Sequence, residues 1–98
     1  MDISPVQRQQ IAEICRRYGV RKMSLFGSAS EGTEGPDSDV DLLVEFIPGQ
    51  APGLAFVDMQ EELSRVFDGR RIDLASTRVL RNPWRRRAIE PQLRTLYQ

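Results

Sequence analysis

Residues 22–46 read KMSLFGSASEGTEGPDSDVDLLVEF, and this stretch decides the fold because two apolar runs flank a turn-rich connection. The first run is a predicted strand that stops at Gly27-Ser28, where a residue without a Cβ atom lets backbone amides approach a ligand closely. The second run, residues 39–46, alternates with period two and predicts another strand. Residues 31–38 are rich in turn formers and predict a loop between the strands.

Two aspartates, Asp39 and Asp41, lie two residues apart on the second predicted strand, so both side chains belong to one face. At about 6.5 to 7 Å, and with an effective dielectric near 20, two such charges repel by roughly 2 kcal/mol. A magnesium ion would neutralise them, because it takes one or two carboxylates and leaves its other positions to water and phosphate oxygens. The amides at Gly27 and the hydroxyl of Ser28 suit phosphate oxygens.

A third carboxylate belongs to Asp73, in the short apolar run of residues 71–75, which predicts a further strand. If this strand lies beside the Asp39 strand, the three carboxylates form an acidic cluster able to hold two metal ions and orient an attacking hydroxyl. Asp39 and Asp41 would then bind metal, while Asp73 completes one metal site and helps deprotonate the nucleophile. The chain has no histidine, which excludes imidazole catalysis and the usual zinc sites.

Helices are predicted on both sides of these strands. Residues 4–19 begin with a capping serine followed by proline and show apolar residues at helical spacing. Leu54–Phe67 predicts a second helix whose apolar side includes Leu54 and Val57. Pro83 opens a third helix, and the conformation of residues 93–97 stays open.

The composition predicts one soluble α/β domain over residues 1–98, with 40% hydrophobic and 29% charged residues and no internal repeat. No apolar stretch approaches the roughly 20 residues that span a membrane, and no secretory signal is present. The single cysteine, Cys15, is expected to be a buried or half-buried helical residue. These features favour the reducing cytoplasm as the location of the protein.

The charge is unevenly distributed, although the net charge is zero. Residues 31–68 contain one arginine and ten acidic residues, whereas residues 69–98 contain eight arginines and two acidic residues. This pattern predicts a metal-binding middle and an end that faces an anion or a partner. The segment Arg81–Arg87 includes Trp84 and is compatible with nucleic acid, but an acidic partner surface uses the same charges and is favoured. Trp84 is expected to pack on the core or on a partner.

Residues 25–28 (Leu-Phe-Gly-Ser) and 36–44 (Pro-Asp-Ser-Asp-Val-Asp-Leu-Leu-Val) resemble the minimal nucleotidyltransferase (MNT) family of the DNA polymerase beta superfamily. The Gly-Ser pair, ten intervening residues and an Asp-x-Asp sequence match the family spacing. The resemblance covers nearly the whole chain. It implies an α/β (α+β) fold of the polymerase beta type, in which a small mixed β-sheet is flanked by helices.

The resemblance also implies roles for five residues. Gly27 and Ser28 would contact the nucleoside triphosphate, Asp39 and Asp41 would ligate magnesium, and Asp73 would be the third catalytic carboxylate. Many members of this family are antitoxins that pair with a HEPN-domain toxin and inactivate it by attaching AMP from ATP to a tyrosine of the toxin. The implied cofactor is Mg²⁺, with two ions, and the implied partner is such a toxin.

One departure concerns the residues after the Gly-Ser pair, where family members usually carry arginine and this chain has Ala29 and Glu31. Either Arg70, Arg71 or an arginine of the tail supplies the missing positive charge, or the protein works mainly by binding. The alternative function is therefore a noncatalytic antitoxin that neutralises its partner by contact. Nucleotide addition to an RNA end or a small molecule lacks support, because a chain of this length has no second domain to hold such a substrate.

Overall fold

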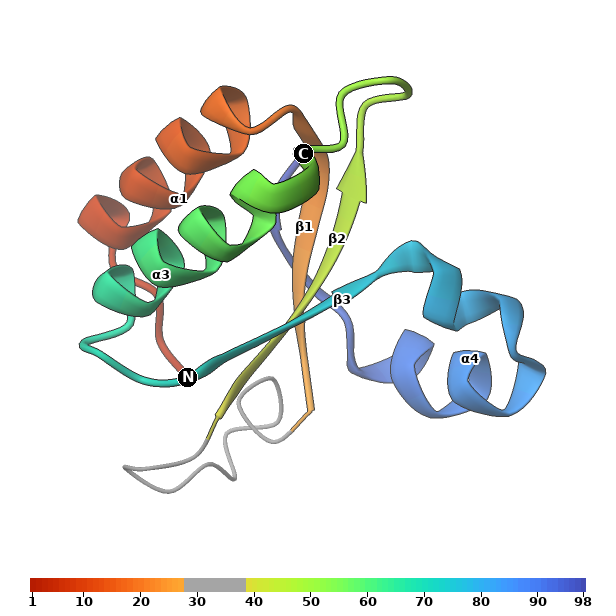
Figure 1. Ribbon diagram of the computed structural model, residues 1–98. Helices are drawn as coiled ribbons and strands as arrows, with labels where there is room; N and C mark the ends of the chain where they lie inside the picture. The colour runs from red at the N-terminus through yellow and green to blue at the C-terminus, as the bar shows by residue number, and fades with distance from the viewer. Residues whose placement is uncertain (28–38) are drawn as a thin grey trace.

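A computed structural model describes residues 1–27 and 39–98 of the chain (Figure 1). Strands and helices are found in each of the segments for which the sequence predicts them. In chain order, the elements are α1 (Pro5–Arg17), β1 (Val20–Phe26), β2 (Val40–Phe46), the 3-10 turn η1 (Gly53–Ala55), α3 (Phe56–Val66), β3 (Ile72–Ser76), the 3-10 turn η2 (Thr77–Arg81), α4 (Pro83–Ile89), the 3-10 turn η3 (Glu90–Gln92) and β4 (Arg94–Tyr97).

The four strands form one mixed sheet in the order β3-β2-β1-β4. Strand β1 pairs antiparallel with both β2 and β4, whereas β2 and β3 are parallel. A parallel pair requires a long connection, and helix α3 lies within it. The expected mixed sheet flanked by helices is confirmed, and the Asp73 strand does lie beside the Asp41 strand.

The hydrophobic core lies between the sheet and the two helices α1 and α3, which cover one face (Figure 1). Val40, Leu42 and Val44 of β2 are fully buried in this core, so Asp41, which alternates with them, projects to the opposite face. Cys15 of α1 is buried in the same core, as predicted. Other buried members are Ile11, Met23, Leu25, Met59, Leu63 and Ile72.

The start of α1 shows the capping arrangement that the sequence predicts. The backbone N–H of Gln7 donates to the hydroxyl of Ser4 at 3.1 Å, and the backbone N–H of Ser4 donates to the side chain of Gln7 at 2.9 Å. Pro5 occupies the first turn, where its missing N–H costs nothing. These contacts satisfy amides that the first turn of a helix leaves without partners.

The second predicted helix begins later than expected. Its first residues form the turn η1, and α3 proper covers only Phe56–Val66. Leu54 is 96% exposed and Val57 is 57% exposed, so the prediction that they join the buried side of the helix is wrong. A 3-10 turn has fewer residues per turn than an α-helix, so its side chains point in different directions about the helix axis. The buried stripe of α3 consists of Met59, Leu63 and Val66.

The second face of the sheet is flanked by the segment from η2 to η3, with α4 standing on the side away from α1 and α3 (Figure 1). Leu43, Thr77, Leu80 and Leu93 help to line a hollow of about 90 Å³ between this segment and the sheet. Strand β4, which the sequence left open, follows the segment and pairs with β1. No helix in the described ranges is long and apolar enough to cross a membrane.

Candidate active site

The parallel register of β2 and β3 places Asp41 directly opposite Asp73. Asp41 is partly buried and Asp73 is exposed, as is Asp39, which immediately precedes β2. Asp41 also lies opposite Phe26, the last residue of β1. The predicted carboxylates therefore gather where β1 ends and β2 and β3 begin, on the face of the sheet that α1 and α3 leave free.

Burial and the neighbouring carboxylates both disfavour the ionised form of Asp41. Burial is the largest cause that raises the pKa of this carboxyl above its ordinary value, and the charges of Asp73 and Asp39 raise it further. A hydrogen bond between the side chains of Asp41 and Asp73 acts in the same direction. The site thus holds carboxylates that repel one another, and a bound cation would relieve that repulsion.

Gly27 is required by the space that Asp41 occupies. A Cβ atom at Gly27 would lie 2.3 Å from the Oδ2 atom of Asp41, well inside van der Waals contact. The residue also has φ +73°, a conformation that side chains of L-amino acids rarely adopt. The sequence predicted a glycine for close approach of a ligand, and the structure adds that it accommodates the neighbouring carboxylate.

Sequence reasoning did not identify Gln92 as part of the site. The backbone N–H of Gly27 donates to its side-chain oxygen Oε1 at 3.0 Å, across 65 positions of the sequence. Gln92 belongs to η3, so the segment that follows α4 is attached to the turn at the end of β1. A lone glutamine between a proline and an ambiguous strand gives no motif, and only the tertiary fold reveals this contact.

Two arginines precede β3, and the structure distinguishes them. The Nη1 atom of Arg70 is buried and has no hydrogen-bond partner in the ranges that the structure describes. Arg71 is exposed, and its carbonyl oxygen accepts the backbone N–H of Val40 at 2.9 Å. Of the two, Arg70 therefore has a buried guanidinium nitrogen that lacks an acceptor, whereas Arg71 is open to solvent.

Part of the predicted site lies outside the described residues, namely Ser28, the loop 31–38 and the departure at Ala29 and Glu31. Within residues 1–27 and 39–98, no three acidic, cysteine or histidine side chains are grouped closely enough to hold a metal ion. The three-carboxylate cluster with two ions therefore stays a prediction. The carboxylate oxygens of the facing residues Asp41 and Asp73 are nevertheless of the kind that magnesium prefers.

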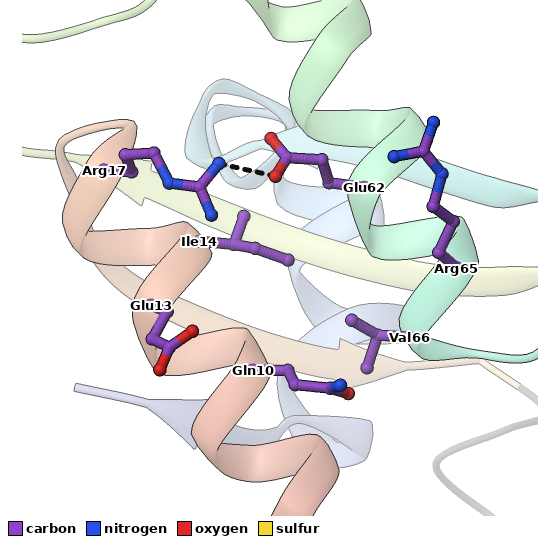
Figure 2. Close-up of a pocket in the computed structure, with 7 residues that line it drawn as sticks. All are labelled: Gln10, Glu13, Ile14, Arg17, Glu62, Arg65 and Val66. Carbon is purple, nitrogen blue, oxygen red and sulfur yellow. Dashed lines mark hydrogen bonds and ion pairs between the residues drawn. The ribbon is translucent and has the colours of Figure 1, made fainter.

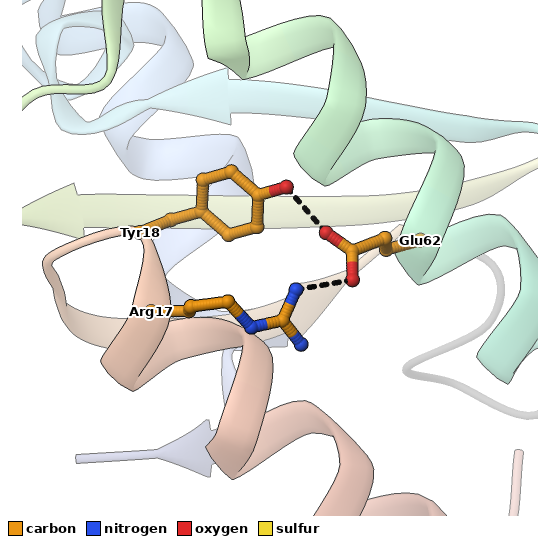
Figure 3. Close-up of polar contacts among 3 residues, drawn as sticks. All are labelled: Arg17, Tyr18 and Glu62. Atoms are coloured by element: carbon orange, nitrogen blue, oxygen red, sulfur yellow. Dashed lines mark hydrogen bonds and ion pairs between the residues drawn. The ribbon is translucent and has the colours of Figure 1, made fainter.

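A second hollow, of about 220 Å³, lies between α1 and α3 (Figure 2). These helices cover the face of the sheet opposite the carboxylates. Ile14 of α1 and Val66 of α3 face each other there, and Arg17 points across the groove to Glu62. The Nη1 atom of Arg17 lies 2.5 Å from the Oε1 atom of Glu62, and the Tyr18 hydroxyl donates to Oε2 of the same carboxylate (Figure 3). This groove thus contains a contact that joins the two helices.

The contact between the helices shifts the pKa values of Glu62 and Tyr18. The hydrogen bonds from Tyr18 and then Arg17 hold the pKa of Glu62 below its ordinary value. The same hydrogen bond to Glu62 raises the pKa of Tyr18. Glu62 is therefore ionised at neutral pH and is held by two donors, which gives it a structural role on the side of the sheet opposite the site.

Comparison with known proteins agrees with this arrangement. Residues 8–94 match the family described as the nucleotidyltransferase domain. A provisionally assigned protein adenylyltransferase of Methanocaldococcus jannaschii is 28% identical over 93 residues, which cover 94% of this chain and 92% of that protein. The protein adenylyltransferase MntA of Thermococcus cleftensis is 42% identical over 64 residues, which cover 63% of this chain and 61% of that protein.

Solved structures share the fold. One described as a minimal nucleotidyltransferase has a TM-score of 0.70 and 31% identity, covering 90% of both chains. Another, a toxin-antitoxin complex with AMP-PNP, has a TM-score of 0.65 and 21% identity, covering 92% of this chain and 72% of that one. The chain therefore belongs to the nucleotidyltransferase domain family, as a minimal nucleotidyltransferase, and is a nucleotidyltransferase enzyme.

Proposed function

We propose that this protein is a magnesium-dependent adenylyltransferase that transfers AMP from ATP to a tyrosine hydroxyl of a HEPN-type toxin and thereby acts as its antitoxin. The observation that carries the proposal is the facing pair Asp41 and Asp73 beside the glycine turn at Gly27. Relatives that bear the name protein adenylyltransferase support the reaction, and a toxin-antitoxin complex of the same fold supports the role. A cytoplasmic protein with access to ATP fits this function.

In this proposal, Gly27 and Ser28 hold the triphosphate, while Asp39, Asp41 and Asp73 are the ligands of magnesium. Bound magnesium neutralises charge on the phosphate oxygens. Asp73 helps to remove the proton of the acceptor hydroxyl, whose oxygen forms a bond to the α-phosphorus. The bond between that phosphorus and the bridging oxygen to the β-phosphate breaks, and pyrophosphate leaves.

The triphosphate also needs a positive side chain, because the residues after the Gly-Ser pair are Ala29 and Glu31. We assign this role to Arg70, three residues before Asp73, since its buried Nη1 atom has no acceptor within the described residues. A guanidinium group binds phosphate oxygens bidentately. Arg71 is the matched comparison, being adjacent, exposed and of equal charge.

The experiment is incubation of the protein with Mg²⁺ and α-phosphate-labelled ATP in lysate of its source cell, followed by digestion with protease or ribonuclease. We expect a labelled band that protease removes, and we expect the label to disappear with Asp39→Asn and Asp41→Asn. Asp58→Asn is the control, because Asp58 is an exposed aspartate of α3, on the other face of the sheet. Chelation of Mg²⁺ should abolish the label, and renewed addition should restore it.

The other outcomes separate the alternatives. Label that only ribonuclease removes would reassign the acceptor to RNA. If the intact protein gives no more label than Asp41→Asn, the protein is a noncatalytic antitoxin that acts by contact. Ala29 and Glu31 favour this alternative, because an acidic residue near a triphosphate repels it.

A further inference from the structure

In helix α4 only Ile89 is half-buried, and the other residues are exposed. Residues 81–88 are all exposed, and no residue of Pro83–Ile89 is buried. The helix is held by its start, where the side-chain oxygen of Asn82 accepts the backbone N–H of Trp84 at 2.9 Å and Pro83 sets the first turn. A seven-residue helix is marginal alone in water, so this one depends on its cap and on the flanking turns η2 and η3, which it contacts.

Trp84 is the most informative residue of this helix. It is the only tryptophan in the sequence, and it is 77% exposed rather than packed on the core. The guanidinium carbon of Arg87 lies 5.7 Å from the centroid of its ring, which orients the ring on the surface. Tryptophan and arginine are among the residues most enriched at protein–protein contacts, so an exposed tryptophan among arginines favours such a contact.

The arginines around Trp84 outnumber the acidic groups near them. We define the arginine surface as Arg78, Arg81, Trp84, Arg85, Arg86 and Arg87, all of which are exposed. Arg86 is paired with Glu90 at 2.6 Å, whereas the other four arginines form no ion pair with any residue in the described ranges. The surface thus presents positive charge that is available to an acidic ligand.

The arginine surface is attached to the candidate active site. Helix α4 leads directly into η3, and Gln92 at the end of η3 accepts the backbone N–H of Gly27. A Cβ atom at Gly27 would touch the carboxylate of Asp41, so Gly27 itself borders the acidic pair. A molecule held on α4 is therefore held on a segment that η3 attaches to the turn beside Asp41.

We propose that the arginine surface docks an acidic patch of the protein that carries the acceptor hydroxyl, an inference that rests on the proposed transfer to a protein. A compact acidic patch contacts only α4 and η2, with Trp84 at the centre of the contact. An extended nucleic acid leaving this surface would instead meet Asp39, Asp41 and Asp73, which repel its phosphates. The zero net charge of the chain likewise gives no general attraction for a polyanion.

The binding test uses a fluorescently labelled glutamate–tyrosine copolymer of about six residues as the acidic probe, because a chain of that length extends over only roughly 20 Å and stands in for a compact acidic patch. A labelled single-stranded oligoribonucleotide is compared with it, and ATP is left out. Fluorescence anisotropy with the full chain should show binding of the copolymer that weakens as salt is added. Arg81→Glu/Arg85→Glu and, separately, Trp84→Ala should weaken binding at least about fivefold. The control variant Arg8→Glu/Arg16→Glu on α1 changes the net charge by the same amount at exposed positions. Its affinity for the copolymer should stay within about twofold of that of the unchanged protein.

Two results would overturn the docking proposal. The first is tighter binding of the oligoribonucleotide than of the copolymer, which would make the surface a nucleic-acid site. The second is equal weakening by the α1 and α4 variants, which would show a response to overall charge alone. Circular dichroism of each variant establishes that it is folded.

A second measurement separates this proposal from the proposed function. Transfer of labelled AMP to the copolymer is followed with the same variants. Copolymer binding that depends on α4, together with no transfer to the copolymer and no protease-sensitive label in the lysate, would contradict the function and support the docking surface. Transfer that Arg81→Glu/Arg85→Glu and Trp84→Ala leave unchanged would contradict the docking surface and support the function.

Discussion

Gly27 is constrained by both its backbone and its surroundings. Its φ of +73° strains any L-residue, and a Cβ atom would collide with Asp41 Oδ2 at 2.3 Å. Gly49 has φ +80°, but a Cβ atom there would meet no atom of a non-neighbouring residue within 4 Å, so Gly49 shares the first constraint without the second. The two glycines therefore separate the effect of backbone strain from displacement of the Asp41 carboxylate.

We predict that Gly27→Ala abolishes nucleotidyl transfer and lowers the free energy of unfolding more than Gly49→Ala does. Strain at positive φ costs about 1–2 kcal/mol in either variant. The collision with Asp41 should add about 1–3 kcal/mol in Gly27→Ala alone. Urea unfolding and AMP transfer measured on both variants test this, and equal activity of the two would contradict the assigned contact.

Asp41 is a residue at which the proposed function opposes stability. Its pKa is raised by burial and by Asp73 and Asp39, so ionisation of this carboxyl costs the folded state free energy. The cost is absent below the ordinary aspartate pKa of about 3.9 and grows as the pH rises through the raised folded value. We predict that Asp41→Asn melts at a higher temperature than the unchanged protein near neutral pH without metal.

The melting temperatures should converge as the pH is lowered below about 4, because both side chains at position 41 are then neutral. Differential scanning calorimetry in chelator across this pH range measures the difference. Asp58→Asn, which removes an exposed carboxylate of α3, controls for loss of charge alone. A lower melting temperature for Asp41→Asn at neutral pH would show that the carboxylate stabilises the fold.

At the scale of elements, η3 serves as a positioning element for the turn after β1. We predict that Gln92→Met, which keeps the length but removes the acceptor, leaves the Gly27 N–H without its partner and destabilises the protein by about 1 kcal/mol. Gln92→Glu restores an acceptor and should recover the melting temperature. Its negative charge beside the proposed triphosphate turn should raise the KM for ATP while kcat changes less.

Gln9→Met on the exposed side of α1 is the matched control, since it removes the same side-chain amide at a position that does not contact Gly27. A positioning role predicts that Gln92→Met and Gln92→Glu differ in stability and in KM. If both variants lose stability and activity equally, the side-chain NH2 group, which both variants lack, and not the accepted hydrogen bond is what position 92 requires.

The elements differ in how far the sequence could predict them. Period two in residues 39–46 and the shorter run around Asp73 predicted two strands, and their pairing confirmed the expected neighbourhood of Asp41 and Asp73. Strand β4 has four residues shortly after a proline and owes its conformation to pairing with β1, so its local pattern is too short to reveal it. The same long-range pairing explains why the contact between Gln92 and Gly27 had no signal in the sequence.

The carboxylate that joins the helices and the carboxylates of the proposed site lie on opposite sides of the sheet. Asp41 and Asp73 lie on the face that α1 and α3 leave free, whereas Glu62 joins α3 to α1 through Tyr18 and Arg17. The pKa of Asp41 is raised and that of Glu62 is lowered, so their contributions to stability change in opposite directions with pH. This separation allows the site to be altered without loosening the helices.

We predict that Glu62→Gln destabilises the protein at neutral pH without changing AMP transfer. A lowered folded pKa contributes stability that is present above the ordinary glutamate pKa of about 4.3 and is lost as the pH falls through the folded value. The difference in thermal midpoint should therefore be largest near neutral pH and should vanish in acid. Glu61→Gln, an exposed neighbour on α3, should change the midpoint little at either pH. An equal loss for Glu62→Gln at neutral and acid pH would mean that the hydrogen bond to Tyr18, and not the charge of Glu62, joins the helices.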